Sequence, residues 1–338
     1  MSTRVAFLFP GQGSQTVGMG ADIYEASPAA RRVFEAADTA LGFPLSSLCF
    51  QGPEDTLRST INAQPAIVTV SLAFLAALQE ALSPDDSSWI SPLTPAFLAG
   101  HSVGEWTELT AASVLSLEET IKGVRERGRL MEQEGTSCPG GMAAIIAMEP
   151  DVVEQVCQEA TERALAEISE PVHPGQGKVI AANYNAPGQI VISGEKRALE
   201  LACELAKARG AKRVIPLAVS GAFHSPVMRP AADALDSVLS ELQIKDAVIP
   251  IISNISATPL TDAHALREEL AKQVASSVQW TKTVEYLVSA GVTTFIEIGP
   301  GNALAGMVKR IAKGVTMLNV SKASDVAKVA AALREAGI

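Results

Sequence analysis

The chain has 338 residues, 37 of them acidic and 27 basic, so its formal net charge is −10 with the four histidines neutral. Apolar residues make up 47% and charged residues 19%, a balance that excludes an intrinsically disordered protein. The negative sum argues against a nucleic-acid partner, because duplexes are held by Lys and Arg against phosphate. The length is about that of two domains.

Cysteine spacing and apolar runs indicate the compartment. The four cysteines are far apart: Cys49, Cys138, Cys157 and Cys203. They fit a reducing environment better than a disulfide scaffold. The first apolar piece ends at Pro10 without a signal-peptide core, and clearly apolar stretches such as 142–148 are far below the roughly 20 residues of a membrane span. We expect a cytoplasmic protein, or an organellar one if a targeting segment was removed, with no membrane partner; the composition permits a monomer.

Short apolar strands alternate with longer helical patterns towards both ends of the chain. The predicted elements are a strand over 5–9, a helix over 65–82, a strand over 96–99, a helix from about 103, a helix over 116–134, a strand over 248–253, a helix from 264, a strand over 293–298, a helix after 301, and a final strand and helix. Pro65 is expected in the first turn of its helix. The 116–134 helix opens with a capping box from Ser116 to Glu119 and ends at Gly135. This alternation predicts an α/β fold with a largely parallel sheet.

The middle of the chain has a different order of elements. It reads strand, helix, strand, strand, helix, strand over 142–148, 150–169, 179–184, 189–193, 195–209 and 213–219. This β-α-β-β-α-β order is the ferredoxin-like arrangement. We therefore expect a small domain at 138–220, inserted between residues 1–137 and 221–338 of a larger α/β domain. Two segments rich in turn-forming residues, 83–95 and 171–177, are expected to be surface insertions.

A Gly-x-Ser-x-Gly pattern spans residues 100–104, where a short apolar strand meets a helix. This is the context of a nucleophile elbow, in which the glycines permit a tight turn that lifts the Ser102 hydroxyl clear of the backbone. The N-terminus of the following helix supplies free N–H groups that favour a developing oxyanion. The alternative is an ordinary turn with incidental glycines.

A serine nucleophile needs a base, and the chain offers four histidines. His101 adjoins Ser102 and is expected to support the site, whereas His173 lies in an insertion and His264 near a helix start. His224 lies after a strand and before a helix, where open α/β sheets place their sites. We predict His224 as the base; the alternative is a capping or surface histidine.

Arg127 lies at the edge of an apolar helical stripe. The stripe on the 116–134 helix consists of Leu117, Ile121, Val124 and Met131. Because Arg127 is three residues after one member and four before another, it shares their side of the helix. A buried arginine needs a carboxylate or phosphate. Two interpretations remain open here, an internal salt bridge and a ligand carboxylate.

A second Gly-rich segment, residues 9–15, follows the first strand. It lacks the spacing of a dinucleotide fold or a P-loop. Its backbone N–H groups are candidates for half of an oxyanion hole, and the alternative is a plain turn. The sequence shows no plausible metal cluster, so we expect no metal.

Taken together, these segments resemble the malonyl-CoA:acyl carrier protein transacylase family and the acyltransferase domains of polyketide synthases. The resemblance extends over almost the whole chain, in the family's order and spacing: FPGQGSQ (9–15), GHSVGE (100–105), RGRLM (127–131), NYNAPGQIVISG (183–194), GAFHSPVM (221–228), VQWTKTVEYL (278–287) and EIGPGNALAGMVKRI (297–311). It implies a hydrolase-like large domain and a ferredoxin-like small one.

The resemblance also implies a catalytic set. Ser102 is similar to the acylated nucleophile and His224 to its base, with a backbone carbonyl, here matched to Gln279, orienting the histidine in place of an acid. The backbone N–H groups of Gln12 and Val103 match the oxyanion hole. Malonyl-CoA and holo acyl carrier protein are the implied substrates, and no cofactor is implied.

Further residues match the family's substrate-binding positions. Arg127 matches the arginine that binds the free malonyl carboxylate, and Phe223 resembles malonyl-type selection because a bulky ring leaves little room for an α-methyl group. Gln64 and Asn185 match polar residues that line or support the site, with capping and turn roles as alternatives. The chain departs from the family by having Trp106 where a tyrosine is common.

Alternatives to a fatty acid synthesis enzyme remain at this stage. They are a trans-acting polyketide acyltransferase, a serine thioesterase or acyl hydrolase with the same dyad, and a non-catalytic carrier-docking protein. Another departure is Asn302 in the GPG loop, where a basic residue is common. Since carrier proteins are usually acidic, docking needs a local basic patch, and Lys309, Arg310 and Lys313 are its best candidates.

Overall fold

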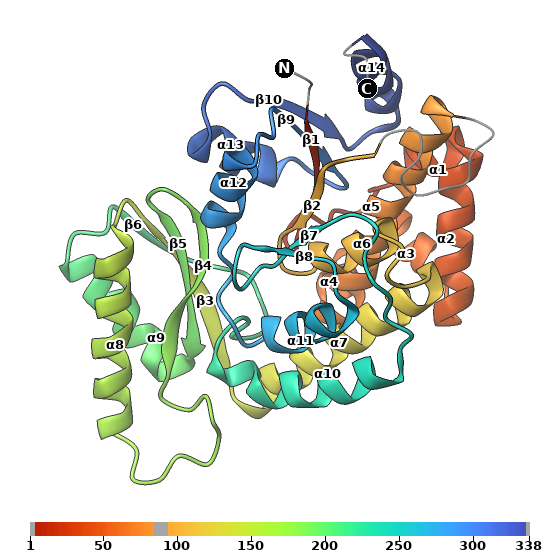
Figure 1. Cartoon of the computed structure of the whole chain (residues 1–338). Helices are drawn as coiled ribbons and strands as arrows, with labels where there is room; N and C mark the ends of the chain where they lie inside the picture. The colour runs from red at the N-terminus through yellow and green to blue at the C-terminus, as the bar shows by residue number, and fades with distance from the viewer. Residues whose placement is uncertain (1–3, 84–93, 336–338) are drawn as a thin grey trace.

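The predicted α/β alternation is present at both ends of the chain, and a separate unit of strands and helices lies between them (Figure 1). The computed structural model describes residues 4–83 and 94–335. The N-terminal part contains β1 (Val5–Phe9), α1 (Ala21–Ala26), α2 (Pro28–Leu41), α3 (Leu45–Gln51), α4 (Glu54–Arg58), α5 (Thr60–Leu82), β2 (Phe97–Gly100), α6 (Gly104–Ala111) and α7 (Leu117–Ser137).

The remaining elements complete both units. The middle part contains β3 (Gly140–Ile146), α8 (Pro150–Ala166), β4 (Val179–Ala186), β5 (Gln189–Glu195), α9 (Lys196–Ala208) and β6 (Arg213–Pro216). The C-terminal part contains the 3-10 turn η1 (Pro226–Met228), α10 (Arg229–Glu241), β7 (Ile251–Ile252), β8 (Pro259–Leu260), α11 (Ala263–Gln273), α12 (Trp280–Ser289), β9 (Thr294–Ile298), α13 (Ala303–Ile311), β10 (Thr316–Val320) and α14 (Ala323–Glu335).

A six-stranded sheet of order β10-β9-β1-β2-β7-β8 organises the larger unit. All its pairings are parallel except that of β7 with the edge strand β8. Side chains of β1 alternate between two apolar clusters, since successive residues of a strand point to opposite faces. Phe7 and Phe9 join the cluster with α5, α6 and α7, whereas Ala6 and Leu8 join the one with α12 and α13. Helices therefore cover both faces, as the sequence predicts.

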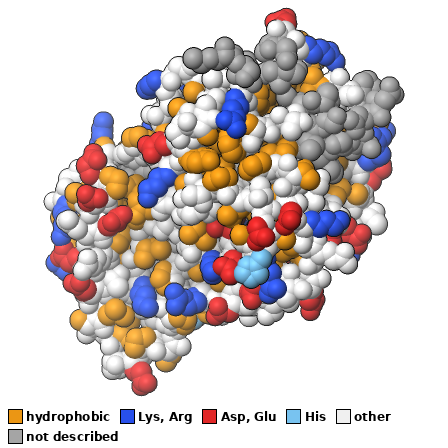
Figure 2. Space-filling model, in the orientation of Figure 1, with side chains coloured by type: hydrophobic (Ala, Val, Ile, Leu, Met, Phe, Trp, Pro, Cys, Tyr) orange, Lys and Arg blue, Asp and Glu red, His pale blue; other side chains and the backbone are white. Residues whose placement is uncertain are grey.

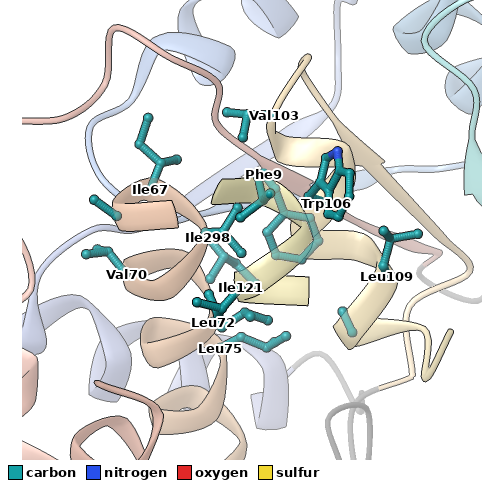
Figure 3. Close-up of a cluster of buried hydrophobic side chains, with 14 of the residues drawn as sticks. Phe9, Ile67, Val70, Leu72, Leu75, Val103, Trp106, Leu109, Ile121 and Ile298 are labelled. Atoms are coloured by element: carbon teal, nitrogen blue, oxygen red, sulfur yellow. The ribbon is translucent and has the colours of Figure 1, made fainter. Parts of the chain in front are cut away.

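Helix α5 runs through the middle of the larger core, where its residues Ile67 and Leu75 pack close to Phe9, Trp106 and other buried side chains (Figure 3). The helix is long and apolar enough to cross a membrane by length and composition, which the apolar runs of the sequence did not reveal. However, 83% of its most apolar window is buried inside the structure. This burial is typical of the central helix of a core.

The smaller unit is built on the antiparallel sheet β4-β5-β3-β6, with α8 and α9 on one face (Figure 1). This strand order and the β-α-β-β-α-β connection confirm the predicted ferredoxin-like arrangement. The unit has its own apolar cluster, whose buried members all fall between Ala143 and Ala206. On that basis we propose that residues 138–220 form a domain inserted between 1–137 and 221–338.

Two predicted helix boundaries are wrong, each for a physical reason. Helix α5 begins at Thr60, five residues early, so Pro65 lies inside it and not in its first turn. Helix α7 continues through Gly135 to Ser137. A Cβ on Gly135 would lie 2.4 Å from the carbonyl oxygen of Ser220. This glycine therefore permits close packing against the segment before His224 and does not end the helix.

The two predicted insertions have different outcomes. Residues 84–93 of the first lie outside the part of the chain that the structure describes. The second, 171–177, exposes Val172 but also packs back onto the larger unit: His173 Nε2 is 3.1 Å from Glu134 Oε2 on α7. A Cβ on Gly175 would lie 2.3 Å from Val227 Cα. The segment is therefore partly a contact between the two units.

Candidate active site

Ser102 lies in the tight turn between β2 and α6, with a left-handed φ of 53°. The flanking glycines are required by close packing. A Cβ on Gly100 would lie 2.1 Å from the carbonyl carbon of Gly104, and one on Gly104 would lie 2.2 Å from the carbonyl oxygen of Phe9. The strand–turn–helix context of a nucleophile elbow, predicted from the spacing, is therefore present.

His224 reaches Ser102 from the loop before η1. Its Nε2 is 2.6 Å from Ser102 Oγ, and the residue is 3% exposed. Its Nδ1 lies 2.9 Å from the carbonyl oxygen of Gln273 and 3.2 Å from that of Ser276. Because carbonyls only accept, Nδ1 carries the proton, and Nε2 is free to accept the hydrogen of the serine hydroxyl.

The prediction that Gln279 supplies the orienting carbonyl is wrong. Gln279 is the N-cap of α12, and its carbonyl accepts from the backbone N–H of Thr283 at 2.9 Å. The carbonyls that hold His224 lie three and six residues earlier, at the end of α11 and just beyond it. The carbonyl of Gln273, in the last turn of α11, also accepts from the Ser276 N–H at 3.2 Å, and its second lone pair is available to the imidazole.

Arg127 lies on α7 beneath the serine and is 1% exposed. Its Nη1 donates to Gln64 Oε1 at 2.6 Å, and its Nη2 donates to Gln273 Oε1 at 2.7 Å and to Ser102 Oγ at 3.3 Å. Burial lowers the pKa of Arg127 to about 10, so the guanidinium keeps its charge at neutral pH. Among residues 4–83 and 94–335 no carboxylate forms an ion pair with Arg127. The internal salt bridge that the sequence left open is therefore not found there.

Gln64 is fully buried on α5, and its side chain joins Arg127 to the packing of α7. Its Nε2 donates to Met131 Sδ at 3.4 Å while its Oε1 accepts from Arg127. Gln64 therefore supports the guanidinium rather than lining the cavity.

The predicted oxyanion-hole residues flank the elbow. A Cβ on Gly11 would lie 2.6 Å from the carbonyl oxygen of His101, so the loop that contains Gln12 packs tightly against the turn. Val103 is the N-cap of α6. Within the described chain, the backbone N–H groups of Gln12 and Val103 donate to no other protein atom. Two donors beside a serine, at a helix N-terminus, are the arrangement that stabilises a developing oxyanion.

A cavity of about 240 Å³ opens onto Ser102 between the two units. Its wall includes Ser102, His224, Phe223 and Asn185. Asn185 Oδ1 lies 2.8 Å from His101 Nε2, so the predicted supporting histidine is held by a predicted site residue. The described residues contain no cluster of His, Cys, Asp or Glu that could hold a metal ion.

Sequence reasoning missed four polar residues of the site. Asn183 lines the cavity, and its buried Oδ1 has no hydrogen-bond partner in the described chain. Its place two residues before Asn185, on the same face of β4, was the available signal. Asn254, Gln273 and Glu105 come from three other elements, and their spacing in the sequence gives no sign that they meet.

Comparison with known proteins identifies the family. The acyl transferase domain family matches residues 6–334. The chain is 44% identical over 334 residues to the malonyl CoA-acyl carrier protein transacylase of Bacillus subtilis, covering 98% of both. An acyl-carrier-protein S-malonyltransferase structure from Bartonella henselae has a TM-score of 0.89 at 39% identity, covering 99% of this chain and 100% of that one.

A second solved structure is a malonyl-transacylase in complex with its type II PKS acyl-carrier protein. It has a TM-score of 0.88 at 35% identity and covers 98% of this chain and 100% of that chain. The fold, the serine–histidine pair and these matches agree. The chain belongs to the acyl transferase family, among the malonyl CoA-acyl carrier protein transacylases.

Proposed function

We propose that the chain transfers the malonyl group of malonyl-CoA to the phosphopantetheine thiol of acyl carrier protein, supplying extender units for fatty acid synthesis. The observation that carries this proposal is Arg127, a buried cation that contacts Ser102 Oγ and has two neutral amide partners. A carboxylate two bonds from the reacting carbonyl is a suitable partner for such a guanidinium. A general acyl hydrolase would not need a buried positive charge beside its nucleophile.

In the first half-reaction, His224 Nε2 takes the Ser102 hydroxyl proton as Oγ forms a bond to the thioester carbonyl carbon. The negative carbonyl oxygen is held by the N–H groups of Gln12 and Val103. As the carbonyl re-forms, the carbon–sulfur bond breaks, and the CoA sulfur leaves as a thiol with the proton from His224. Malonyl-Ser102 remains, with its free carboxylate on Arg127.

In the second half-reaction, His224 takes the proton of the carrier-protein thiol, and the sulfur attacks the malonyl-serine carbonyl. The bond between Ser102 Oγ and the carbonyl carbon then breaks, and His224 returns the proton to Oγ. The products are malonyl-carrier protein and free enzyme. Transfer requires that the thiol displace water as the nucleophile in this largely buried site.

The proposal is tested by intact-protein mass spectrometry after brief exposure to malonyl-CoA, with and without holo acyl carrier protein. We expect one malonyl adduct that is stable alone and is discharged onto the carrier protein. Release of malonate at the same rate without carrier protein would support a hydrolase. The absence of a malonyl adduct, with an adduct from another acyl-CoA, would contradict the assignment of Arg127 and Phe223.

The activity should persist to unusually low pH for a histidine base. Burial, reinforced by the positive charge of Arg127, lowers the pKa of His224 from 6.5 to about 3. The imidazole must be neutral to accept a proton, so activity is lost only when the pH falls towards this depressed pKa. We expect kcat/KM for malonyl-CoA to stay level as the pH falls through 6.5, and Arg127→Ala to move the decline upward. A wild-type decline centred near 6.5 would contradict this environment.

The end of α13 supports a place for the carrier protein to dock. Ala303 and Met307 of this helix line the cavity. Exposed Lys309 follows in its last turn, and exposed Lys313 lies just beyond its end. In the described chain neither lysine has a carboxylate partner. Arg310 instead donates to Pro187 O and Gln189 Oε1 of the smaller unit. Lys313 Nζ donates only to the Lys309 carbonyl, at 3.1 Å, so the two lysines are the part of the predicted basic patch that is not bound to the smaller unit.

Charge reversal tests this docking site. Lys309→Glu with Lys313→Glu is expected to raise the KM for carrier protein several-fold and to leave the KM for malonyl-CoA unchanged, because rim charges steer association with an acidic partner. Lys322→Glu with Lys328→Glu, an equal charge change beside and on α14, is the matched control. Both double variants change the net charge by the same amount, so long-range repulsion alone should affect them equally. Figure 2 shows acidic and basic side chains interspersed over one face of the molecule. Equal increases would reject the patch.

Composition supports the remaining parts of the proposal. The four cysteines are free, which fits a reducing compartment such as the cytoplasm. We infer a monomer that works on two substrates in turn, malonyl-CoA and acyl carrier protein, without a cofactor. A role with a polyketide carrier protein instead of a fatty acid one is the alternative, and discharge assays with both carriers distinguish them.

A further inference from the structure

Glu105 is a buried acid that the mechanism above does not use. It lies in the first turn of α6, three residues after Ser102, and is 1% exposed. Its carboxyl oxygens accept from three N–H groups: Oε1 from the backbone N and from Nδ2 of Asn254, both at 3.0 Å, and Oε2 from Gln273 Nε2 at 2.6 Å. The carboxyl group of Glu269 lies beside it. A buried carboxyl group with this many donors has a defined orientation, and it also fixes the orientation of the side chains that donate to it.

The Asn254 side of Glu105 holds the elbow. Asn254 Nδ2 also donates to Gly100 O at 2.7 Å. The amide oxygen of Asn254 is therefore turned to accept from the Ser102 backbone N–H at 2.7 Å. This bridge joins Gly100 to Ser102 across the intervening residue and so fixes the start of the strained turn. The carboxyl group therefore acts on the position of Ser102 through one amide.

The Gln273 side reaches the other two reactive groups. Both hydrogens of its Nε2 are used, on Glu105 and on Ser102 O at 2.9 Å, so its Oε1 faces Arg127 Nη2 at 2.7 Å. The backbone carbonyl of the same residue accepts from His224 Nδ1 at 2.9 Å. Gln273 is thus hydrogen-bonded to all three of Ser102, Arg127 and His224.

We propose that Glu105 is a positioning residue: it sets the amide orientation of Gln273 and thereby directs the Arg127 guanidinium towards the acyl group on Ser102. The proposal rests on the proposed malonyl transfer. Without an acceptor at Glu105, one hydrogen of Gln273 Nε2 loses its partner, and only the Ser102 carbonyl still holds the nitrogen end of the amide away from the guanidinium. With Glu105 in place, the amide oxygen of Gln273 must face Arg127, because the Glu105 carboxyl group and the Ser102 carbonyl both require a hydrogen from the amide nitrogen.

Replacing Glu105 by glutamine separates its two sides. In the wild type both carboxyl oxygens of Glu105 accept hydrogen bonds. The glutamine amide has one oxygen that can accept and one nitrogen that can only donate. Asn254 offers two donors and Gln273 one, so the oxygen is expected to remain towards Asn254 and the nitrogen to face Gln273. Gln273 must then rotate its oxygen away from Arg127 or lose its bond. The contacts of Asn254 with the Ser102 turn are expected to remain, whereas the orientation of the Arg127 guanidinium is expected to change.

The test compares Glu105→Gln with Glu108→Gln, using malonyl-CoA and acetyl-CoA as acyl donors. Glu108 is on the same helix, is fully buried and contacts neither Asn254 nor Gln273 through a hydrogen bond in the described chain. We expect Glu105→Gln to lower kcat/KM for malonyl-CoA at least tenfold through KM, and that for acetyl-CoA less than threefold. Glu108→Gln should preserve the ratio between the two donors.

Equal losses for both donors in Glu105→Gln, or the same change of ratio in Glu108→Gln, would overturn the positioning role. If Glu105→Gln does not fold, Gln273→Leu removes the acceptor on Arg127 while leaving Asn254 with Glu105, and must give the same selective loss of malonyl-CoA. The wild type separates the two proposals: a wild-type enzyme that does not prefer malonyl-CoA to acetyl-CoA would contradict the proposed function itself.

Discussion

Ser102→Ala is expected to abolish malonyl transfer, reducing kcat by about 10⁴-fold or more, as removal of a nucleophile does in serine enzymes. Ser102 Oγ is the atom that His224 Nε2 contacts at 2.6 Å, and it also accepts from Arg127. An alanine methyl cannot form the acyl-enzyme, so both half-reactions lose their shared intermediate. Mass spectrometry should show no malonyl adduct on this variant.

The strained turn makes a control necessary for this experiment. Alanine accepts the positive φ of residue 102 no better than serine, so a change in folding must be excluded by circular dichroism and thermal unfolding. Ser113→Ala is the matched control, because Ser113 also has a positive φ, of 60°, and lies away from the cavity lining. A folded Ser102→Ala enzyme that transfers malonyl groups at the wild-type rate would refute the assigned nucleophile.

Arg127→Ala is expected to lower kcat/KM for malonyl-CoA by about 10²- to 10³-fold, the value of two charge-assisted hydrogen bonds to a carboxylate. Acetyl-CoA lacks that carboxylate, so its rate should change far less. The ratio between the two acyl donors is therefore the informative quantity. It separates loss of a ligand contact from loss of structure, which would lower both rates together.

The matched control for this variant is Arg129→Ala on the same helix. Arg129 forms an exposed ion pair with Glu126, of the kind that contributes about 0–1 kcal/mol. It should retain both rates. Removal of Arg127 also leaves the oxygens of Gln64 and Gln273 without their donor, so some loss of thermal stability is expected. Equal losses of malonyl and acetyl transfer would make Arg127 a structural residue.

Local sequence determined much of the secondary structure and the turn that carries Ser102. The capping box at Ser116 and Glu119 forms as its spacing predicts, because a cap depends on atoms within one turn. The 100–104 pattern likewise encodes its own turn, since the close contacts of Gly100 and Gly104 leave no room for a side chain. The β-α-β-β-α-β unit follows from alternation and length.

Some predictions failed where a distant contact overrode a local signal. Gly135 was expected to end a helix, but the constraint on it comes from Ser220, far along the chain. Pro65 was expected in a first turn, yet the helix starts earlier because Thr60 and Ala63 are buried in the core. Packing energy exceeds local preference in both cases.

The sequence by itself determined the α/β fold, and it predicted Ser102 on an elbow, Arg127 at the edge of a buried helical stripe and an inserted unit. Only the tertiary structure decided which atoms complete the site. The carbonyl behind His224 belongs to Gln273, not Gln279, and Glu105 meets residues 149 and 168 positions away in Asn254 and Gln273. Hydrogen bonds of this kind depend on distances of a few tenths of an ångström between elements, and no periodicity in the sequence records them.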